Sequence, residues 1–383
     1  MDERERSPDD IRTPDDSEPV ADDDRPGGAL GLVDGAGGAW QVLPSELDEL
    51  RRAVADASRP LVERVEAYED MLDSEVGDTD LTRARNIERE VGLRQIYLKF
   101  EGGNPTGTQK DRIAFAQALD SLRRGYEGMT VATCGNYGAA VALAAGLAGL
   151  RCVIYIPAGY HAKRAEEMAR YGAEVVRVPG DYETAVQSSR ERAARDEMYD
   201  ANPGGDNTAL QLRAYGEIAH EIYDQLRDAP AAVAVPVSNG TTLAGVHRGF
   251  VSLYRRGKTS RIPKLIAGSS FRQNPIVQAF VKGADHCEDL SPERIRETSV
   301  NEPLINWHSI DGDLALAAVR ESGGWAGHAS DRSLLVSARL IRAQQGLNVI
   351  PASAAGLHVL ADRHAKEPLP GDRYVAILTG RRP

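Results

Sequence analysis

From Gln95 onward, short apolar segments rich in β-branched residues alternate with longer segments of helical composition. Because parallel neighbouring strands need a crossover, usually a helix, this alternation predicts an α/β fold with parallel-type sheets flanked by helices. The predicted strands are Gln95–Phe100, Met129–Ala132, Cys152–Ile156, Ala173–Val178, Ala231–Val237, Lys264–Ala267 and Arg373–Leu378. The predicted helices are Lys110–Arg124, Asn136–Ala148, Ala162–Tyr171, Tyr182–Arg195, Ala209–Leu226, Leu243–Arg255, Asp331–Gln345 and Ala354–His364. With 383 residues the chain can bury a complete core, and we expect two lobes.

The N-terminal segment differs in composition from the rest. Residues 1–25 contain 11 acidic and 4 basic side chains and so carry −7 of the formal net charge of −11. Such a segment buries too little apolar surface to offset its ordering entropy, so we expect it to be disordered. A glycine-rich linker, Gly27–Gly38, follows, and Pro44–Leu50 is expected to begin a helix with Ser45 as its cap. The other 358 residues, with a net charge of −4, present no basic face for nucleic acid.

The sequence also bears on the compartment. The acidic N-terminus has no apolar stretch of the kind found in signal peptides. The apolar run Tyr137–Pro157 contains glycines and Arg151, which favours a buried helix, turn and strand over a membrane span. The cysteines Cys134, Cys152 and Cys287 lack the spacing of a disulfide framework or a zinc site. We therefore expect a cytoplasmic protein without a metal and without membrane contact.

Lys110 lies in the most informative segment of the chain, Glu101–Arg112. A predicted strand precedes this glycine-rich turn and a predicted helix follows it, with Thr106 or Thr108 available as N-cap. Lys110 therefore belongs to the first turn of a helix, where the helix dipole disfavours a cation. A neutral lysine amine can attack a carbonyl, so Lys110 is a candidate catalytic residue. A solvated lysine at a loop–helix junction is the alternative.

Three further turns follow predicted strands, and the first two also open a helix. They are Thr133–Gly138, Ser238–Thr242 and the Thr379-Gly380 turn near the C-terminus. Ligands of parallel sheets gather at the carboxyl ends of the strands, so we expect these turns to converge with Lys110. Backbone N–H groups at a helix N-terminus suit an anion. Plain glycine turns between a strand and a helix are the alternative interpretation of each.

The segment Asn104–Arg112 resembles the cofactor-lysine motif of fold-type II pyridoxal-phosphate (PLP) enzymes, and the chain is most similar to the threonine synthase family. Thr108 and Gln109 stand where that family usually has a serine and a phenylalanine. The three glycine turns follow in the family's order, and the resemblance covers roughly residues 90–383. It implies a two-lobed fold similar to the tryptophan synthase β-subunit, and a homodimer. The expected units are a tail and linker at 1–38, a large PLP-binding domain of 39–115 plus 200–383, and a smaller inserted α/β domain at 116–199.

The resemblance also implies roles for the residues of these turns. Lys110 would hold PLP and act as general base, and Asn136 would bond the ring hydroxyl. The pyridine nitrogen would meet Thr379. The residues implied for the cofactor phosphate are Ser238, Asn239, Gly240, Thr241 and Thr242. Those implied for the substrate carboxylate are Thr133, Cys134, Gly135, Asn136 and Tyr137.

The segment Pro351–Gly356 is similar to the family's segment before the penultimate helix, with Ile350 in place of its usual glutamate. Judged on its own, Ser353 is expected to be an N-cap.

The resemblance implies chemistry at the β- or γ-carbon of an amino acid. The leading expectation is a threonine synthase-like conversion of O-phosphohomoserine to threonine and phosphate. Lys163, Arg164 and Arg213 are each expected to be solvated helix residues, with contact to the substrate phosphate as the alternative. The alternative enzyme is a β-replacing or deaminating relative: a cysteate or cysteine synthase, a serine/threonine dehydratase or a diaminopropionate ammonia-lyase. A cofactor-free regulatory protein on the same fold is the alternative from another class. Dinucleotide binding is excluded because no Gly-X-Gly-X-X-Gly follows an early strand.

Overall fold

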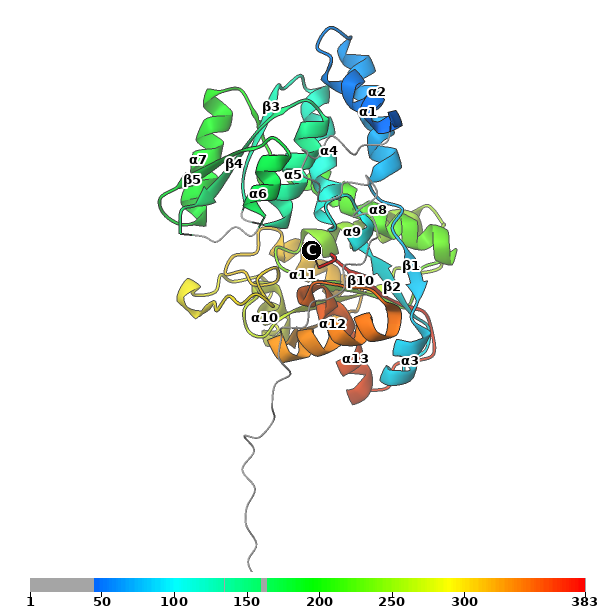
Figure 1. Cartoon of the computed structure of the whole chain (residues 1–383). Coiled ribbons are helices and arrows are strands. Elements are labelled where there is room, and N and C mark those ends of the chain that lie inside the picture. The colour runs from blue at the N-terminus through cyan, green and yellow to red at the C-terminus, as the bar shows by residue number, and fades with distance from the viewer. Residues whose placement is uncertain (1–44, 134, 160–163, 383) are drawn as a thin grey trace, which may run out of the picture.

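A computed structural model describes residues 45–133, 135–159 and 164–382. Two sheets lie in two lobes, with helices against both (Figure 1). The predicted α/β fold with parallel-type sheets is confirmed. The expected tail, linker and Ser45 cap lie outside the described side chains, and the expected division into domains stays a prediction.

The larger sheet has six strands in the order β1-β2-β10-β7-β8-β9. Every neighbouring pair is parallel except the edge pair β1 and β2. The strands are β1 (Leu81–Arg83), β2 (Ile96–Phe100), β7 (Ala232–Pro236), β8 (Lys264–Ser270), β9 (Trp325–Ala329) and β10 (Tyr374–Leu378). Leu378 pairs with Phe100, and Ala376 with Ala234. The residues that follow β2, β7 and β10 therefore meet at one edge of this sheet.

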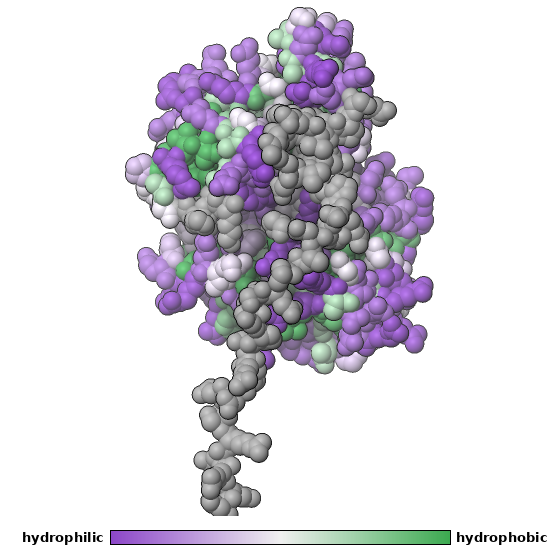
Figure 2. All heavy atoms as spheres, viewed as in Figure 1, coloured by the Kyte–Doolittle hydropathy of each residue, from purple (hydrophilic) through white to green (hydrophobic). Residues whose placement is uncertain are grey.

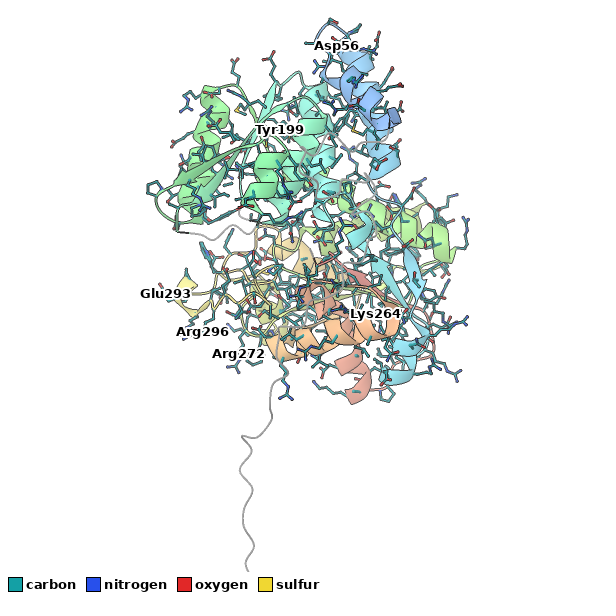
Figure 3. The ribbon with its side chains drawn as sticks, viewed as in Figure 1. Asp56, Tyr199, Lys264, Arg272, Glu293 and Arg296 are labelled. Atoms are coloured by element: carbon teal, nitrogen blue, oxygen red, sulfur yellow. The ribbon has the colours of Figure 1, made fainter. Side chains whose placement is uncertain are left out.

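The smaller sheet is parallel throughout, in the order β5-β4-β3-β6. Its strands are β3 (Gly128–Ala132), β4 (Arg151–Pro157), β5 (Glu174–Val178) and β6 (Tyr199–Asp200). Tyr199 lies in this lobe, whereas Lys264 lies in the lobe of the larger sheet (Figure 3). The face shown in Figure 2 carries mostly hydrophilic residues on both lobes.

Thirteen α-helices surround the sheets in the described part of the chain. Those predicted are α1 (Ser45–Ala55), α4 (Lys110–Arg123), α5 (Asn136–Leu147), α6 (Ala165–Arg170), α7 (Tyr182–Arg195), α8 (Thr208–Leu226), α9 (Thr241–Arg255), α12 (Asp331–Gln345) and α13 (Ala355–Lys366). Those not predicted are α2 (Leu61–Glu75), α3 (Arg85–Val91), α10 (Pro275–Lys282) and α11 (Gly312–Glu321). The strands β1, β6 and β9 were not predicted either. None of the described helices has the length and apolar character needed to cross a bilayer.

Helices α8 and α9 pack against each other at glycines. A Cβ added to Gly249 would lie 2.5 Å from the carbonyl oxygen of Gly216, and one added to Gly245 would lie 2.9 Å from that of Leu212. Only glycine permits this approach. The close packing fixes the N-terminus of α9, which follows the Ser238–Thr242 turn.

A buried ion network joins β2, α4 and α8. The Arg112 guanidinium contacts Glu101 (Nε–Oε2, 2.6 Å) and Glu221 (Nη1–Oε1, 2.7 Å). Lys99 Nζ lies 2.6 Å from Glu221 Oε2. Burial alone would raise the pKa of Glu221, but the charges of Arg112 and Lys99 lower it to about 2. Glu221 therefore holds two buried cations on one carboxylate.

We predict that Glu221→Ala destabilises the protein by about 3–5 kcal/mol, because it leaves the buried Lys99 without its carboxylate and Arg112 with Glu101 alone. Urea unfolding measures the loss, and Glu217→Ala, on the exposed face of the same helix, serves as the control. The Glu221 carboxylate has a lower pKa in the folded protein, so its contribution is present above its ordinary pKa of 4.5 and is lost as the pH falls toward 2. Equal loss in both variants at neutral pH contradicts the prediction.

Candidate functional site

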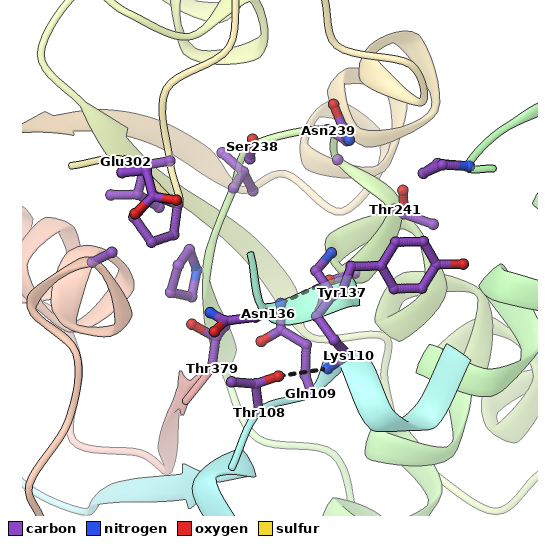
Figure 4. A pocket seen from close by; sticks show the side chains of 18 of the residues that line it. Thr108, Gln109, Lys110, Asn136, Tyr137, Ser238, Asn239, Thr241, Glu302 and Thr379 are labelled. Carbon is purple, nitrogen blue, oxygen red and sulfur yellow. Dashed lines mark hydrogen bonds between the residues drawn. The ribbon is translucent and has the colours of Figure 1, made fainter. Parts of the chain in front are cut away.

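A cavity of about 230 Å³ lies where the predicted turns meet (Figure 4). Thr108, Gln109 and Lys110 line it from the start of α4, and Thr379 lines it after β10. The other predicted site residues that line it are Thr133, Asn136, Tyr137, Ser238, Asn239, Gly240, Thr241 and Thr242. Gly135 is partly buried but does not line it, and Cys134 lies outside the described residues. The structure therefore brings together four turns that are far apart in the sequence.

Lys110 is partly buried at the N-terminus of α4, where the hydroxyl oxygen of Thr108 accepts its backbone N–H at 3.2 Å. Its Nζ has no hydrogen bond or ion pair within the described chain and lies 5.9 Å from the ring centre of Tyr137 and 6.0 Å from that of Tyr215. Loss of solvation lowers the pKa of the amine to about 8, although the charge of Asp311 acts in the opposite direction. A substantial fraction of the amine is therefore neutral near physiological pH.

The Asn136 turn is held from behind by Arg164, whose Nη1 donates to Asn136 Oδ1 at 2.8 Å. Arg164 also donates to the carbonyl oxygen of Thr106 at 3.0 Å and pairs with Glu167 at 2.6 Å. Its guanidinium is thus bonded within the protein, and the expectation that Arg164 is a solvated helix residue is wrong. The Tyr137 hydroxyl points away from the cavity, toward the carbonyl oxygen of Ala201 at 2.7 Å.

The Ser238–Thr242 turn is fixed by the segments behind it. The carbonyl oxygen of Ser238 accepts from Asn274 Nδ2 at 2.9 Å and from Ser309 Oγ at 3.0 Å. Gly240 has φ +92°, and a Cβ there would lie 2.8 Å from the carbonyl oxygen of Asp311. The N–H groups of Thr241 and Thr242 begin α9 and have no partner in the described chain. This turn can receive an anion.

Thr379 is positioned by Ser353. Their hydroxyl oxygens are 3.0 Å apart, and Ser353 Oγ also accepts the N–H of Gly380 at 2.9 Å. The expectation that Ser353 is an N-cap is wrong, because α13 begins at Ala355 with Ala354 as its cap and no side-chain cap bond. Ser353 is instead fully buried beneath the cavity.

Two carboxylates that the sequence did not indicate belong to the site: Glu302 lines the cavity, and Asp311 lies behind Thr241, which lines it. Glu302 lines it, with Oε1 3.6 Å from where a Cβ on Gly135 would be, and Figure 4 shows its side chain across the cavity from Lys110. Asp311 is 4% exposed and accepts a hydrogen bond from the Thr241 hydroxyl. Both belong to a segment without regular periodicity, so only its acidic residues could have drawn attention to it.

Other predicted residues are not brought to the cavity. Arg213 is exposed on α8 and does not line the cavity, which agrees with the expectation of a solvated helix residue. Lys163 lies outside the described residues.

The Gln109 amide lines the cavity, donates weakly to Thr242 Oγ1 at 3.5 Å, and leaves Oε1 buried without a partner in the described chain.

Comparison with known proteins identifies relatives over most of the chain. The family model of the pyridoxal-phosphate-dependent enzymes matches residues 72–380. Threonine synthase of Methanocaldococcus jannaschii is 32% identical over 79% of this chain and 74% of its own length. Threonine synthase of a Synechocystis species is 30% identical over 88% and 87%.

Solved structures share the fold at lower identity. Maize serine racemase aligns with a TM-score of 0.69 and 19% identity, covering 83% of this chain and 94% of its own. Threonine deaminase isoform 2 from Solanum lycopersicum aligns with a TM-score of 0.68 and 18% identity, covering 84% and 90%.

The residues of the cavity fit a phosphorylated aldehyde such as PLP. A desolvated amine without a partner can hold the aldehyde group, and the turn at Gly240, where a side chain would collide with Asp311, leaves its N–H groups for a phosphate. The Thr379 hydroxyl can meet a ring nitrogen. No group of three or more His, Cys, Asp or Glu side chains able to hold a metal occurs among the described residues.

We predict that the Lys110 amine reacts with an acylating reagent with a midpoint near pH 8, because only the neutral amine is nucleophilic. Brief acetylation of the cofactor-free protein at a series of pH values, followed by mass spectrometry of its peptides, measures the midpoint. The exposed Lys258 provides the internal comparison. A Lys110 midpoint at or above the ordinary lysine value of 10.5 contradicts the expected desolvation.

Proposed function

Because the chain belongs to the pyridoxal-phosphate-dependent enzymes, we propose that it catalyses replacement or elimination at the β- or γ-carbon of an amino acid. The leading reaction is a threonine synthase-like conversion of O-phosphohomoserine to threonine and phosphate. Two observations support it: the amine of depressed pKa beside an anion-binding turn, and the 30–32% identity with threonine synthases over most of the chain. The first of these carries the proposal.

In this proposal each turn has one task. When bound, PLP supplies an electron sink for negative charge at the substrate α-carbon. Lys110 holds the cofactor, and its Nζ takes and returns the α-proton, for which a pKa near 8 is well matched. The N–H groups of the Ser238–Thr242 turn hold the phosphate.

The remaining turns orient the ring and the substrate. Asn136 faces the ring hydroxyl, and the Thr133–Tyr137 turn binds the substrate carboxylate. Thr379 meets the pyridine nitrogen with a neutral hydroxyl, which does not force that nitrogen to be protonated. Ser353 fixes the rotamer of Thr379 by its contact at 3.0 Å.

We predict that Lys110→Ala loses the visible absorbance that the cofactor shows when a lysine amine holds it, and loses activity by at least about 10²–10⁴-fold, the range of a positioned acid or base. Absorbance spectra of the purified variants test the first part. Lys258→Ala, which removes an exposed lysine far from the turns, should keep both properties. A Lys110→Ala protein that retains the absorbance refutes the assignment.

The charges of the cavity favour a second candidate, a β-replacing or deaminating enzyme acting on a substrate without phosphate. Of the described residues that line the cavity, Lys110 is the one cation, whereas Glu302 is an anion beside the predicted carboxylate turn. A substrate phosphate near Glu302 would be repelled. Arg164, one of the expected partners of that phosphate, is bonded to Asn136 and Glu167.

A substrate panel separates the two candidates. The holoenzyme is incubated with O-phosphohomoserine, serine, threonine, O-acetylserine, O-phosphoserine and 2,3-diaminopropionate, and the release of phosphate, ammonia, acetate and keto acid is measured. Phosphate and threonine from O-phosphohomoserine support the leading reaction. Ammonia or keto acid from the unphosphorylated substrates supports the second candidate, and Glu302→Gln should then raise the KM for diaminopropionate, whose second amine is cationic, more than that for serine.

The homodimer, the cytoplasmic location and the division into 39–115 plus 200–383 and 116–199 are parts of the same proposal. They derive from the resemblance and from the composition. Size-exclusion chromatography with light scattering tests the dimer.

A further inference from the structure

The most unexpected group at the cavity is the carboxyl of Asp311, which lies directly behind the turn assigned to a phosphate. Its backbone N–H donates to the carbonyl oxygen of Asn239 at 3.0 Å. Its side chain accepts from the hydroxyl of Thr241, and more weakly from that of Thr208 at 3.5 Å. A buried anion is thus joined to the hydroxyl of a residue that lines the anion-binding cavity.

The Thr241 hydroxyl has only one hydrogen. While Asp311 is ionised, that hydrogen points to the carboxylate, and Thr241 presents only lone pairs to a phosphate oxygen. If Asp311 carries a proton, the carboxyl donates to Thr241 Oγ1, and the hydrogen of Thr241 becomes available to the phosphate. The protonated carboxyl also removes the repulsion between two anions in a poorly solvated place.

We propose that Asp311 takes up a proton when the Ser238–Thr242 turn binds a phosphate group, and that Thr241 transmits this exchange as a hydroxyl relay. Asp311 is then a positioning residue, which acts on the ligand through Thr241. The inference rests on the proposed function, because it takes this turn as the phosphate site.

Few charged groups act on Asp311. Burial raises the pKa of Asp311, which the hydrogen bonds of Thr241 and Thr208 and the charge of Lys110 on α4 oppose. The ionisable side chains of the neighbouring elements contact other groups or solvent. Asp313 contacts His286 and the backbone of Cys287, His247 on α9 lies near Glu321, and Lys282 on α10 is exposed.

Isothermal titration calorimetry tests the inference with inorganic phosphate as the probe and the full-length, cofactor-free chain. Titrations near pH 7 in two buffers of different ionisation enthalpy give the number of protons taken up per phosphate bound. We expect the wild-type protein to take up more protons per phosphate bound than the Asp311→Asn variant, with a difference approaching one proton. The titration of phosphate itself contributes equally to both proteins. Because Asp311 acts on the pKa of Lys110, the same pair is also compared in a Lys110→Ala background, where the difference isolates Asp311.

Two further variants complete the experiment. Asp313→Asn, two residues away and facing His286, should take up as many protons as wild type. Thr241→Val removes the relay hydroxyl but leaves Asp311 and its repulsion with the phosphate, so it should take up fewer protons than wild type and more than Asp311→Asn. The test therefore does not depend on one variant folding. Equal proton uptake in wild type, Asp311→Asn and Thr241→Val overturns the relay.

The same measurements distinguish failure of the relay from failure of the proposed function. If the wild-type chain binds neither phosphate nor PLP, the assignment of the turn fails and the relay fails with it. If phosphate binds to all variants with the same proton uptake, only the relay is wrong. Phosphate binding is measured instead of activity, because activity would also depend on the catalytic role of Lys110.

Discussion

The buried contact between Arg112 and its two carboxylates is the constraint on which the geometry of the cavity depends. It joins α4, which carries Arg112, to the segment directly after β2, which carries Glu101, and to α8, which carries Glu221. Residues two apart on an α-helix point in directions about 200° apart, so fixing Arg112 toward Glu101 and Glu221 directs Lys110 to the opposite side. Asp111, between them, accepts from the Thr106 hydroxyl at 2.7 Å and closes the turn. Lys110, Asp111 and Arg112 therefore point in three different directions, and of these three only Lys110 points into the cavity.

The larger sheet brings the other turns to the same place through its register. Parallel strands end at one edge, so the residues after β2, β7 and β10 are neighbours although more than a hundred residues separate each from the next. The close packing of α8 on α9 then fixes the N-terminus of α9, where the N–H groups of Thr241 and Thr242 have no partner among the described residues. The proposed anion site would therefore be a consequence of backbone geometry, and Gly240 is needed in this turn because its conformation and its contact with Asp311 exclude a side chain.

The sequence predicted the parts of this structure that have a regular pattern. Central strands such as β7 and β10 are continuous apolar runs, which are typical of sheets covered on both faces. The strand β9 has the sequence Trp-Ala-Gly-His-Ala, which lacks β-branched residues, and β6 has only two residues, so pairing with neighbours determines both. Lys110, Asn136 and Thr379 were predictable because each belongs to a glycine turn after a strand. The positions of Glu302 and Asp311 and the contact of Ser353 with Thr379 were not predictable, since they arise from long-range contacts in irregular segments.

Lys110 in the cavity and Asp311 behind Thr241 influence each other's pKa, which explains why a proton relay would matter to the lysine. Asp311 raises the pKa of Lys110, while burial lowers it to about 8. If a phosphate bound beside an ionised Asp311, two anions would act on the amine and hold it in its protonated form. Uptake of a proton at Asp311 leaves one anionic group instead of two, so the amine can still lose its proton near neutral pH. Proton uptake at Asp311 would thus favour both the binding of the phosphate and the neutral, nucleophilic form of the Lys110 amine.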